Sequence, residues 1–169
     1  MMPAPLAICA LLSLLMSGAI FGFFYAWLCS TMWGLDTAEP TVAIAAMQAM
    51  NASVRNIVFF PAFFGTPAIL AVSALVARAY RHPRAGWAFG AAALVYFAGA
   101  FLVTMTFNVP MNTDLASVAV PPSGTEAARI WQDYSVPWQF WNDVRTIACA
   151  IALLLTGYAL LTLGRDAAR

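Results

Sequence analysis

Four long apolar stretches dominate the pattern of hydrophobic and polar positions along the chain. They cover about residues 6–33, 56–77, 85–107 and 137–163. Each has the roughly 20 residues that a helix needs to cross a hydrocarbon core of about 30 Å. A cleavable signal peptide is the alternative for the first stretch, but no basic residue precedes Arg55 and the apolar run is too long. The pattern therefore predicts four retained membrane-spanning helices.

The connections after the first and third stretches carry helix signals of their own. Pro40 opens an Ala- and Met-rich run, with proline at a first-turn position. Ser123 and Glu126 have capping-box spacing ahead of a second run, which Pro137 would end. The predicted fold class is all-α: an integral membrane four-helix bundle with short extra helices in the two outward-facing loops. It forms a single membrane domain over residues 1–169.

Composition and charge agree with this fold and indicate an orientation. Hydrophobic residues make up 63 % of the chain and charged residues only 9 %, against about 25 % charged in soluble domains. A net charge of +1 with no lysine excludes a nucleic-acid-binding surface. The arginines of the short second loop and the tail are Arg78, Arg81, Arg84, Arg165 and Arg169. Because positive charge stays on the cytoplasmic side, we expect a bacterial inner-membrane protein with both termini in the cytoplasm.

Residues that hold metals or haem are scarce. The three cysteines, Cys9, Cys29 and Cys149, lie in apolar stretches without CxxC or CxxH spacing, and His82 is the only histidine. We interpret the cysteines as packing residues. We therefore expect no metal and no other cofactor.

Polar side chains within or beside the spans are costly unless paired, so their positions are informative. They concentrate in the outer halves of the spans. On a helix, positions i, i+3, i+4 and i+7 share one face. This spacing relates four residues of the fourth stretch: Trp138, Trp141, Asn142 and Arg145. Other polar positions near the same depth are Gln48, Asn51, Asn108, Asn112 and Asp143.

Two interpretations of this polar set stand side by side. Pro110 is expected to break the third helix and free carbonyls, to which the asparagines and Arg145 can donate. In the simpler view, Asn108 and Asn112 only cap that end, and Arg145 snorkels outward to pair with Asp143 or Asp133. The outer tryptophans then form an interfacial belt; they are Trp33, Trp131, Trp138 and Trp141. Because several amides and a guanidinium gather at one level of an apolar bundle, the set as a whole favours a cavity.

Four sequence words resemble the anthrone oxygenase-like family of small four-span membrane proteins. They are Ala46-Met-Gln-Ala-Met-Asn51, Ala62-Phe-Phe-Gly-Thr66, Phe107-Asn-Val-Pro-Met-Asn112 and Trp141-Asn-Asp-Val-Arg-Thr146. Fungal members of this family oxidise anthrones to anthraquinones with molecular oxygen, without a metal or flavin. The resemblance thus implies a cofactor-independent oxidoreductase.

The resemblance also implies roles for particular residues. The polar positions shared with the family are Asn51, Asn108, Asn112, Asn142 and Arg145. We expect the asparagines, with Gln48 and Trp141, to bind the substrate, and Arg145 to hold a developing oxyanion. Asp143 is the nearest candidate base and stands where the family often has a histidine.

Three functions are compatible with the sequence. The first is oxidation of a flat phenolic or anthrone-like lipophile that enters from the outer leaflet. The second is non-catalytic binding of a membrane lipid or a quinone-like ligand, by a homo-oligomer or an accessory subunit of a membrane complex. A transporter is least favoured, because a pathway needs polar groups at both depths and the inner halves of the spans have few.

Overall fold

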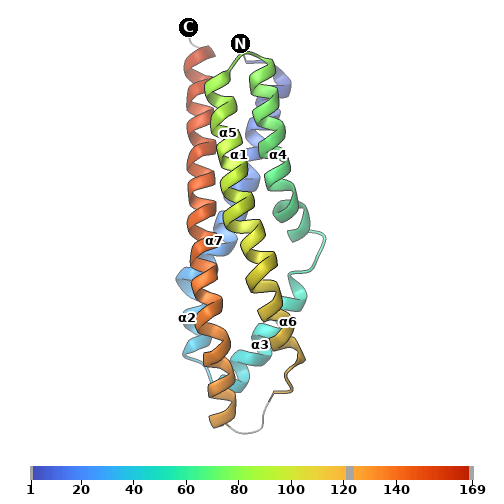
Figure 1. Ribbon diagram of the computed structural model, residues 1–169, viewed down its shortest axis with the longest axis vertical. Helices are drawn as coiled ribbons and strands as arrows, with labels where there is room; N and C mark the ends of the chain where they lie inside the picture. The colour runs from blue at the N-terminus through green and yellow to red at the C-terminus, as the bar shows by residue number, and fades with distance from the viewer. Residues whose placement is uncertain (1, 121–123, 168–169) are drawn as a thin grey trace.

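The computed structural model describes residues 2–120 and 124–167, and the regular elements in these ranges are all helices (Figure 1). The elements form four rods, with one shorter helix between the first two. In chain order they are α1 (Ala4–Ala26), the π-helical η1 (Trp27–Thr31) and α2 (Met32–Asp36) in the first rod; the short α3 (Pro40–Ser53); α4 (Phe59–Ala79); α5 (Pro83–Tyr96), η2 (Phe97–Leu102), η3 (Thr104–Asn108) and α6 (Val109–Ser117) in the third rod; and α7 (Gly124–Ala167).

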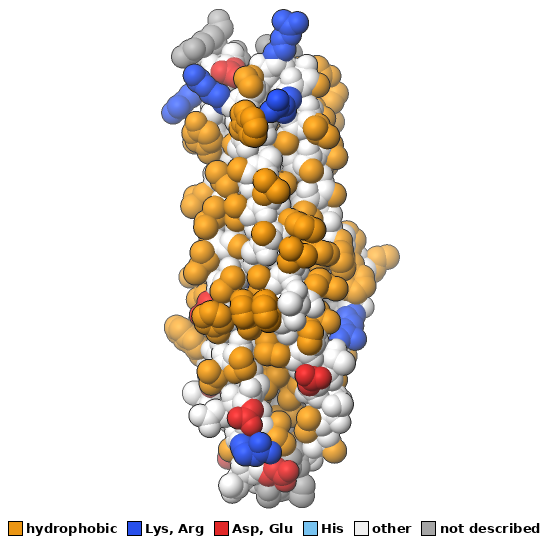
Figure 2. Space-filling view, in the orientation of Figure 1, with side chains coloured by type: hydrophobic (Ala, Val, Ile, Leu, Met, Phe, Trp, Pro, Cys, Tyr) orange, Lys and Arg blue, Asp and Glu red, His pale blue; other side chains and the backbone are white. Residues whose placement is uncertain are grey.

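The four rods pack side by side, and each is long and apolar enough to cross a membrane. Helices α1, α4, α5 and α7 form a ring in which each contacts two neighbours. Large apolar side chains point outward along the ring; Leu15, Leu94 and Leu154 are 68 %, 71 % and 73 % exposed. Figure 2 shows hydrophobic side chains along the length of the molecule, with most charged side chains on this face toward its two ends. The all-α membrane fold predicted from the sequence is confirmed.

The bundle is longer than a bilayer core is thick. Helix α7 has 44 residues, which at 1.5 Å per residue is about 65 Å. A hydrocarbon core measures about 30 Å. Both described chain ends lie at one end of the bundle, and α2, α3 and α6 lie at the other (Figure 1). One end of the bundle must therefore extend beyond the hydrocarbon.

Two helix boundaries differ from the expectation, both at prolines. Pro110 does not break the third rod: it is the second residue of α6, directly after the π-helical η3, and the helix continues to Ser117. Pro137 lies inside α7, which already begins at Gly124. The helix expected in the third loop is thus present but joins the fourth rod, and Ser123 of the capping box lies outside the described residues.

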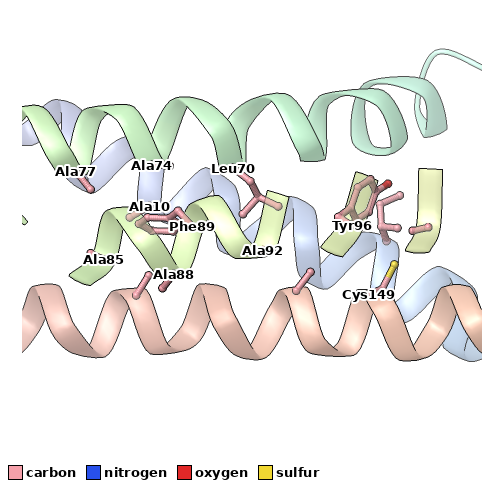
Figure 3. Close-up of a cluster of buried hydrophobic side chains, with 14 of the residues drawn as sticks. Ala10, Leu70, Ala74, Ala77, Ala85, Ala88, Phe89, Ala92, Tyr96 and Cys149 are labelled. Atoms are coloured by element: carbon pink, nitrogen blue, oxygen red, sulfur yellow. The ribbon is translucent and has the colours of Figure 1, made fainter. Parts of the chain in front are cut away.

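Two clusters of buried side chains form the core. The larger fills the membrane ring, where small side chains let α4 and α5 approach closely (Figure 3). Labelled members of this cluster are Ala74, Ala77, Ala85, Ala88 and Ala92. The smaller cluster fills the opposite end, where α2, α3, α6 and α7 meet. Its members include Met32, Ile44, Met47, Leu115, Trp131 and Trp138.

A buried tyrosine compensates for the proline inside α4. Pro67 has no N–H, so the carbonyl of Phe63, four residues earlier, lacks its helical donor. The hydroxyl of Tyr96 on α5 donates to that carbonyl at 2.8 Å. This bond ties α4 to α5 at a point where a bare carbonyl would otherwise be buried.

We predict that Tyr96→Phe lowers the unfolding free energy in micelles by about 0.5–2 kcal/mol, as for other hydrogen bonds within membranes. Tyr158→Phe is the control, because that side chain is 51 % exposed. In a Pro67→Ala background, the restored N–H satisfies the Phe63 carbonyl, so Tyr96→Phe should cost less. An equal cost in both backgrounds would contradict this account.

Candidate functional site

Arg145 lies inside the bundle and is only 3 % exposed. Its Cζ lies 4.5 Å from the ring centroid of Phe24 and 5.1 Å from that of Trp138. Its Nη2–H donates to Asn142 Oδ1 at 3.0 Å, and its Nη1–H to Thr104 Oγ1 at 3.4 Å. Arg145 therefore does not snorkel outward to an aspartate; it is fixed between two aromatic rings.

No carboxylate among the described residues neutralises this cation. The ion pairs there are His82 with Asp166 and Arg129 with Asp133, and neither includes Arg145. The Nε of Arg145 is buried and has no hydrogen-bond partner within residues 2–120 and 124–167. Burying an ion without a partner costs several kcal/mol, and a guanidinium does not lose its proton readily. The bundle thus holds a positive charge with unused donors.

A cavity of about 350 Å³ lies beside Arg145. It lies where the two clusters meet, since Phe24 and Phe63 belong to the larger one and Trp138 to the smaller. Its walls are mainly aromatic rings: Phe23, Phe24, Trp27, Phe59, Phe60, Phe63, Phe64 and Trp138. Its polar lining is Asn51, Arg55, Thr104, Asn112, Thr113 and Arg145. A small set of polar groups in an apolar wall is typical of a ligand pocket.

Hydrogen bonds orient the two asparagines that line the cavity. Asn112 Oδ1 accepts from the Tyr134 hydroxyl at 2.8 Å and from Trp138 Nε1–H at 2.9 Å. Because an indole N–H can only donate, the atom it meets must be the amide oxygen. The Asn112 NH₂ group is therefore left without a partner among the described residues. Asn51 Nδ2 donates to the same Tyr134 hydroxyl at 3.3 Å.

Asn142 supports Arg145 from behind the cavity wall. It is 1 % exposed and does not line the cavity. Its Oδ1 accepts from Arg145, and its Nδ2 donates to the carbonyl of Phe24 at 3.2 Å. A single amide thus links the guanidinium to the first rod, so its role here is to position Arg145.

Asn108 is buried next to α7 and does not cap a helix. Its Nδ2 donates to the carbonyl of Trp138 at 3.3 Å, and its Oδ1 has no partner among the residues that the structure describes. As the residue before α6, it makes no side-chain capping bond. The expectation that the asparagines and Arg145 donate to carbonyls freed by Pro110 is also wrong. Asn108 and Arg145 donate to the Trp138 carbonyl and to side chains instead, because the third rod stays helical.

Gln48 closes the end of a helix and does not line the cavity. Its Nε2 donates to the carbonyls of Leu115 and Val118, at 2.8 and 2.9 Å. The last carbonyls of a helix have no intrahelical donor, so Gln48 satisfies the end of α6. Its contribution is to the position of α6 and thereby of Asn112.

The outer tryptophans do not form one belt. Trp33 is exposed, and Trp141 stacks on Phe107 with ring centroids 3.6 Å apart, outside the cavity. Trp131 and Trp138 are instead buried in the smaller cluster. The expectation of an interfacial belt therefore fails for these two, because α7 continues as a helix beyond Pro137 and packs their rings inward.

Asp143 faces away from the cavity. It follows Asn142 on α7, and one step along a helix turns a side chain about 100°, so Asp143 is exposed while Arg145 is buried. No Asp, Glu, His or Cys appears among the described residues that line the cavity. In the same part of the chain, no group of three or more such side chains could hold a metal ion. The described lining of the cavity therefore offers two arginines and amide donors but no side-chain base.

The sequence interpretation missed a polar clamp next to the site. Asp36, at the end of α2, accepts from Trp131 Nε1, Ser135 Oγ and Gln139 Nε2 at 2.9, 2.7 and 2.9 Å. These donors recur every four residues on α7, which is a recognisable helical face. This face was not recognised in the sequence, because the expected start of the fourth span near Pro137 falls between Ser135 and Gln139. The clamp joins the first rod to α7, two neighbouring rods that both line the cavity.

One comparison with known proteins gives a match. The model of a family described as "Anthrone oxygenase" matches residues 56–155, which is more than half of the chain. The matched segment contains Asn112 and Arg145, whereas Asn51 and Arg55 precede it. No curated protein and no solved structure matches the chain.

The burial of Arg145 generates a prediction about stability. We expect Arg145→Met to raise the unfolding free energy of the ligand-free protein by about 1–3 kcal/mol, because methionine fills similar volume without an unpaired charge. Unfolding titrations in micelles would measure this. The exposed, ion-paired Arg129 supplies the control: Arg129→Met should change stability by less than about 0.5 kcal/mol. A destabilised Arg145→Met protein would show that Arg145 serves the fold.

Proposed function

This chain belongs to the anthrone oxygenase family, and on that premise we propose that it oxidises a flat phenolic or anthrone-like lipophile with molecular oxygen. The reaction takes place in the cavity beside Arg145. One observation carries the proposal: a buried guanidinium that has no carboxylate partner in the described part of the chain lines an aromatic cavity. Such a site favours a planar ligand that bears negative charge.

The aromatic lining suits a planar ring system. Small-molecule sites usually measure about 300–1,000 Å³, and this cavity, at about 350 Å³, is at the small end of that range. Rings of Phe24, Phe63 and Trp138 offer faces and edges for offset or edge-to-face packing. A small, apolar slot accepts a flat tricycle more readily than two flexible acyl chains.

The charge of Arg145 suits the ionised form of an anthrone. An anthrone has a methylene opposite a carbonyl, and loss of a methylene proton gives an enolate with its charge on oxygen. Arg145 and the free NH₂ of Asn112 hold that oxygen. Donors fixed in advance in a low-dielectric site stabilise such a charge strongly. Asn142 contributes by keeping the guanidinium in place.

The electrons for oxygen reduction come from the enolate. Its carbon gives up electrons to O₂ and forms a C–O bond, and the resulting peroxide takes up a proton. The hydroperoxide then loses water and leaves a carbonyl. The methylene thus becomes C=O, one oxygen atom enters the product, and the other leaves as water. The two hydrogens of that water balance the two that the methylene loses, since the proton released to solvent on enolate formation is replaced when the peroxide is protonated.

The proton from the methylene leaves through the open side of the cavity in this proposal. The described lining holds no carboxylate or imidazole to receive it, and Asp143 lies on another face of α7. Arg145 lowers the free energy of the enolate, so water at the cavity mouth suffices as acceptor. Asp143 therefore has no role as base.

The same observation favours one alternative function. A cavity with a cation and amide donors but no side-chain base would also bind a quinone or phenolate without converting it. The chain would then be a binding protein or an accessory subunit of a membrane complex. Substrate turnover distinguishes this alternative from the oxygenase.

We further propose that the bundle end that holds both termini faces the cytoplasm of the bacterial inner membrane. Arg78 lies in the last turn of α4, Arg84 in the first turn of α5 and Arg165 in the last turn of α7. All three therefore lie at this end, and positive charge is retained on the cytoplasmic side. The cavity then lies in the half of the bundle toward the outer leaflet.

We predict that purified protein converts an anthrone to its quinone with one O₂ consumed per quinone formed. Arg145→Met should lower kcat/KM about 100-fold or more, the usual cost of losing an oxyanion donor. The kcat/KM of Arg145→Lys should lie between those of wild type and Arg145→Met, because an ammonium group keeps the charge but not the fork geometry of a guanidinium. Quinone absorbance and an oxygen electrode would follow the reaction.

Asp143→Asn tests whether Asp143 is the acceptor of the methylene proton. The proposal expects kcat/KM within about threefold of the wild-type value, because Asp143 does not reach the cavity; losing a general base typically costs 10²–10⁴-fold. Turnover at the uncatalysed rate in wild type and every variant would rule out the oxygenase function and leave the binding function as the remaining proposal.

A further inference from the structure

A second arginine lines the same cavity at its open side. Arg55 lies in the linker between α3 and α4, and its side chain is exposed whereas that of Arg145 is buried. No ion pair or side-chain hydrogen bond involves Arg55 within residues 2–120 and 124–167. The cavity thus has one cation at its closed end and another at its mouth.

The mouth opens on the flank of the bundle. Phe60 and Phe64 of α4 and Met105 of η3 line the cavity and are 42 %, 46 % and 44 % exposed. These residues lie on rods that are long and apolar enough to cross the membrane. The linker between α3 and α4, which holds Arg55, protrudes on the α4 side of the bundle (Figure 1). The rim of the mouth is therefore mainly apolar, and its exposed polar lining consists of Arg55 and Thr113.

The linker marks the level where water gives way to hydrocarbon. Ser53 and Asn56 are polar and exposed, while Ile57 and Val58, directly before α4, are 86 % and 81 % exposed. Apolar side chains exposed to this degree are stable in lipid and costly in water. Arg55 thus lies at the polar edge of a lipid-facing opening, where a long cationic side chain is favoured.

We propose that Arg55 selects substrates with a second acidic group, so that the preferred substrate is a planar aromatic bearing a carboxylate or acidic phenol remote from the carbonyl that becomes the enolate. This inference rests on the proposed function and deepens it. An amphiphile of this kind lies in the bilayer with its acid at the interface and its rings in the hydrocarbon. The rings of the substrate therefore enter the mouth on the flank ahead of its acidic group. This orientation brings the enolate oxygen to Arg145 and the acid to Arg55.

The experiment compares two unreactive, product-like quinones of matched shape. Anthraquinone-2-carboxylate carries the acid, and 2-methylanthraquinone does not. Both are titrated into wild type, Arg55→Gln and Arg55→Lys in phosphatidylcholine nanodiscs, with quenching of tryptophan fluorescence as the readout. Trp27 and Trp138 line the cavity and report occupancy. Arg129→Gln is the matched control, because it removes an exposed cation that lies off the cavity.

The measured quantity is the ratio of the two dissociation constants. We expect wild type to prefer the carboxylate about tenfold, and Arg55→Gln to reduce that preference at least about fivefold, as for loss of one charge-assisted contact. Arg55→Lys should retain most of the preference, and Arg129→Gln all of it.

Three results would overturn the proposal. They are equal binding of both quinones by wild type, a carboxylate preference that survives Arg55→Gln, and a preference that vanishes when phosphatidylglycerol is added to the discs. The last result would mean that lipid phosphate occupies Arg55. Because these ligands do not react, the outcome is independent of turnover: failure to oxidise an anthrone would remove the proposed function but leave this test intact.

Discussion

The organisation of this protein depends on keeping one guanidinium inside an apolar bundle. Arg145 lies between the rings of Phe24 and Trp138, with hydrogen bonds to Asn142 and Thr104. Its charge has no carboxylate partner among the described residues. A bundle that only had to fold would place an apolar side chain there. The retained cation is the feature from which we infer an anionic ligand.

The scaffold places this cation at a natural discontinuity. The membrane ring and the smaller distal cluster are separate cores, and a cavity forms where they meet. Two π-helical segments lie on its walls: Trp27 comes from η1, and Thr104 and Met105 come from η3. A π-helical turn shifts the faces of the helix beyond it, and such turns are frequent at functional sites. Because of these turns, the first and third rods can pack side chains into both cores and still leave a cavity between the cores.

Much of the fold could be predicted from the sequence because bilayer thickness constrains helix length strongly. The four rods and the helix after Pro40 follow from apolar run length and one proline signal. The prolines at positions 110 and 137 were harder to interpret, since their effect depends on packing. Trp131 and Trp138 pack on both sides of Pro137, and this burial outweighs one lost backbone hydrogen bond.

The candidate site could be predicted only in part. The structure brings Asn51, Asn112 and Arg145 to one cavity, as the shared depth and helical spacing suggest. It places Gln48 at a helix end and Asp143 on the outer face of α7. Depth along a helix is readable from sequence, but rotation about the helix axis is set by neighbours. The roles of the amides also depend on hydrogen bonds between distant segments, such as those of Tyr134 with Asn51 and Asn112.

The central claim is that Arg145 stabilises an anionic oxygen in the cavity, and the ionisation of a bound phenol measures this directly. 2-Hydroxyanthraquinone changes its visible absorbance when its hydroxyl ionises, so its titration can be followed while it is bound to excess protein. The account predicts that the phenol ionises at lower pH when bound to wild type than when bound to Arg145→Met, because an adjacent cation favours the charged form. Ionisation at the same pH in both proteins would contradict the claim.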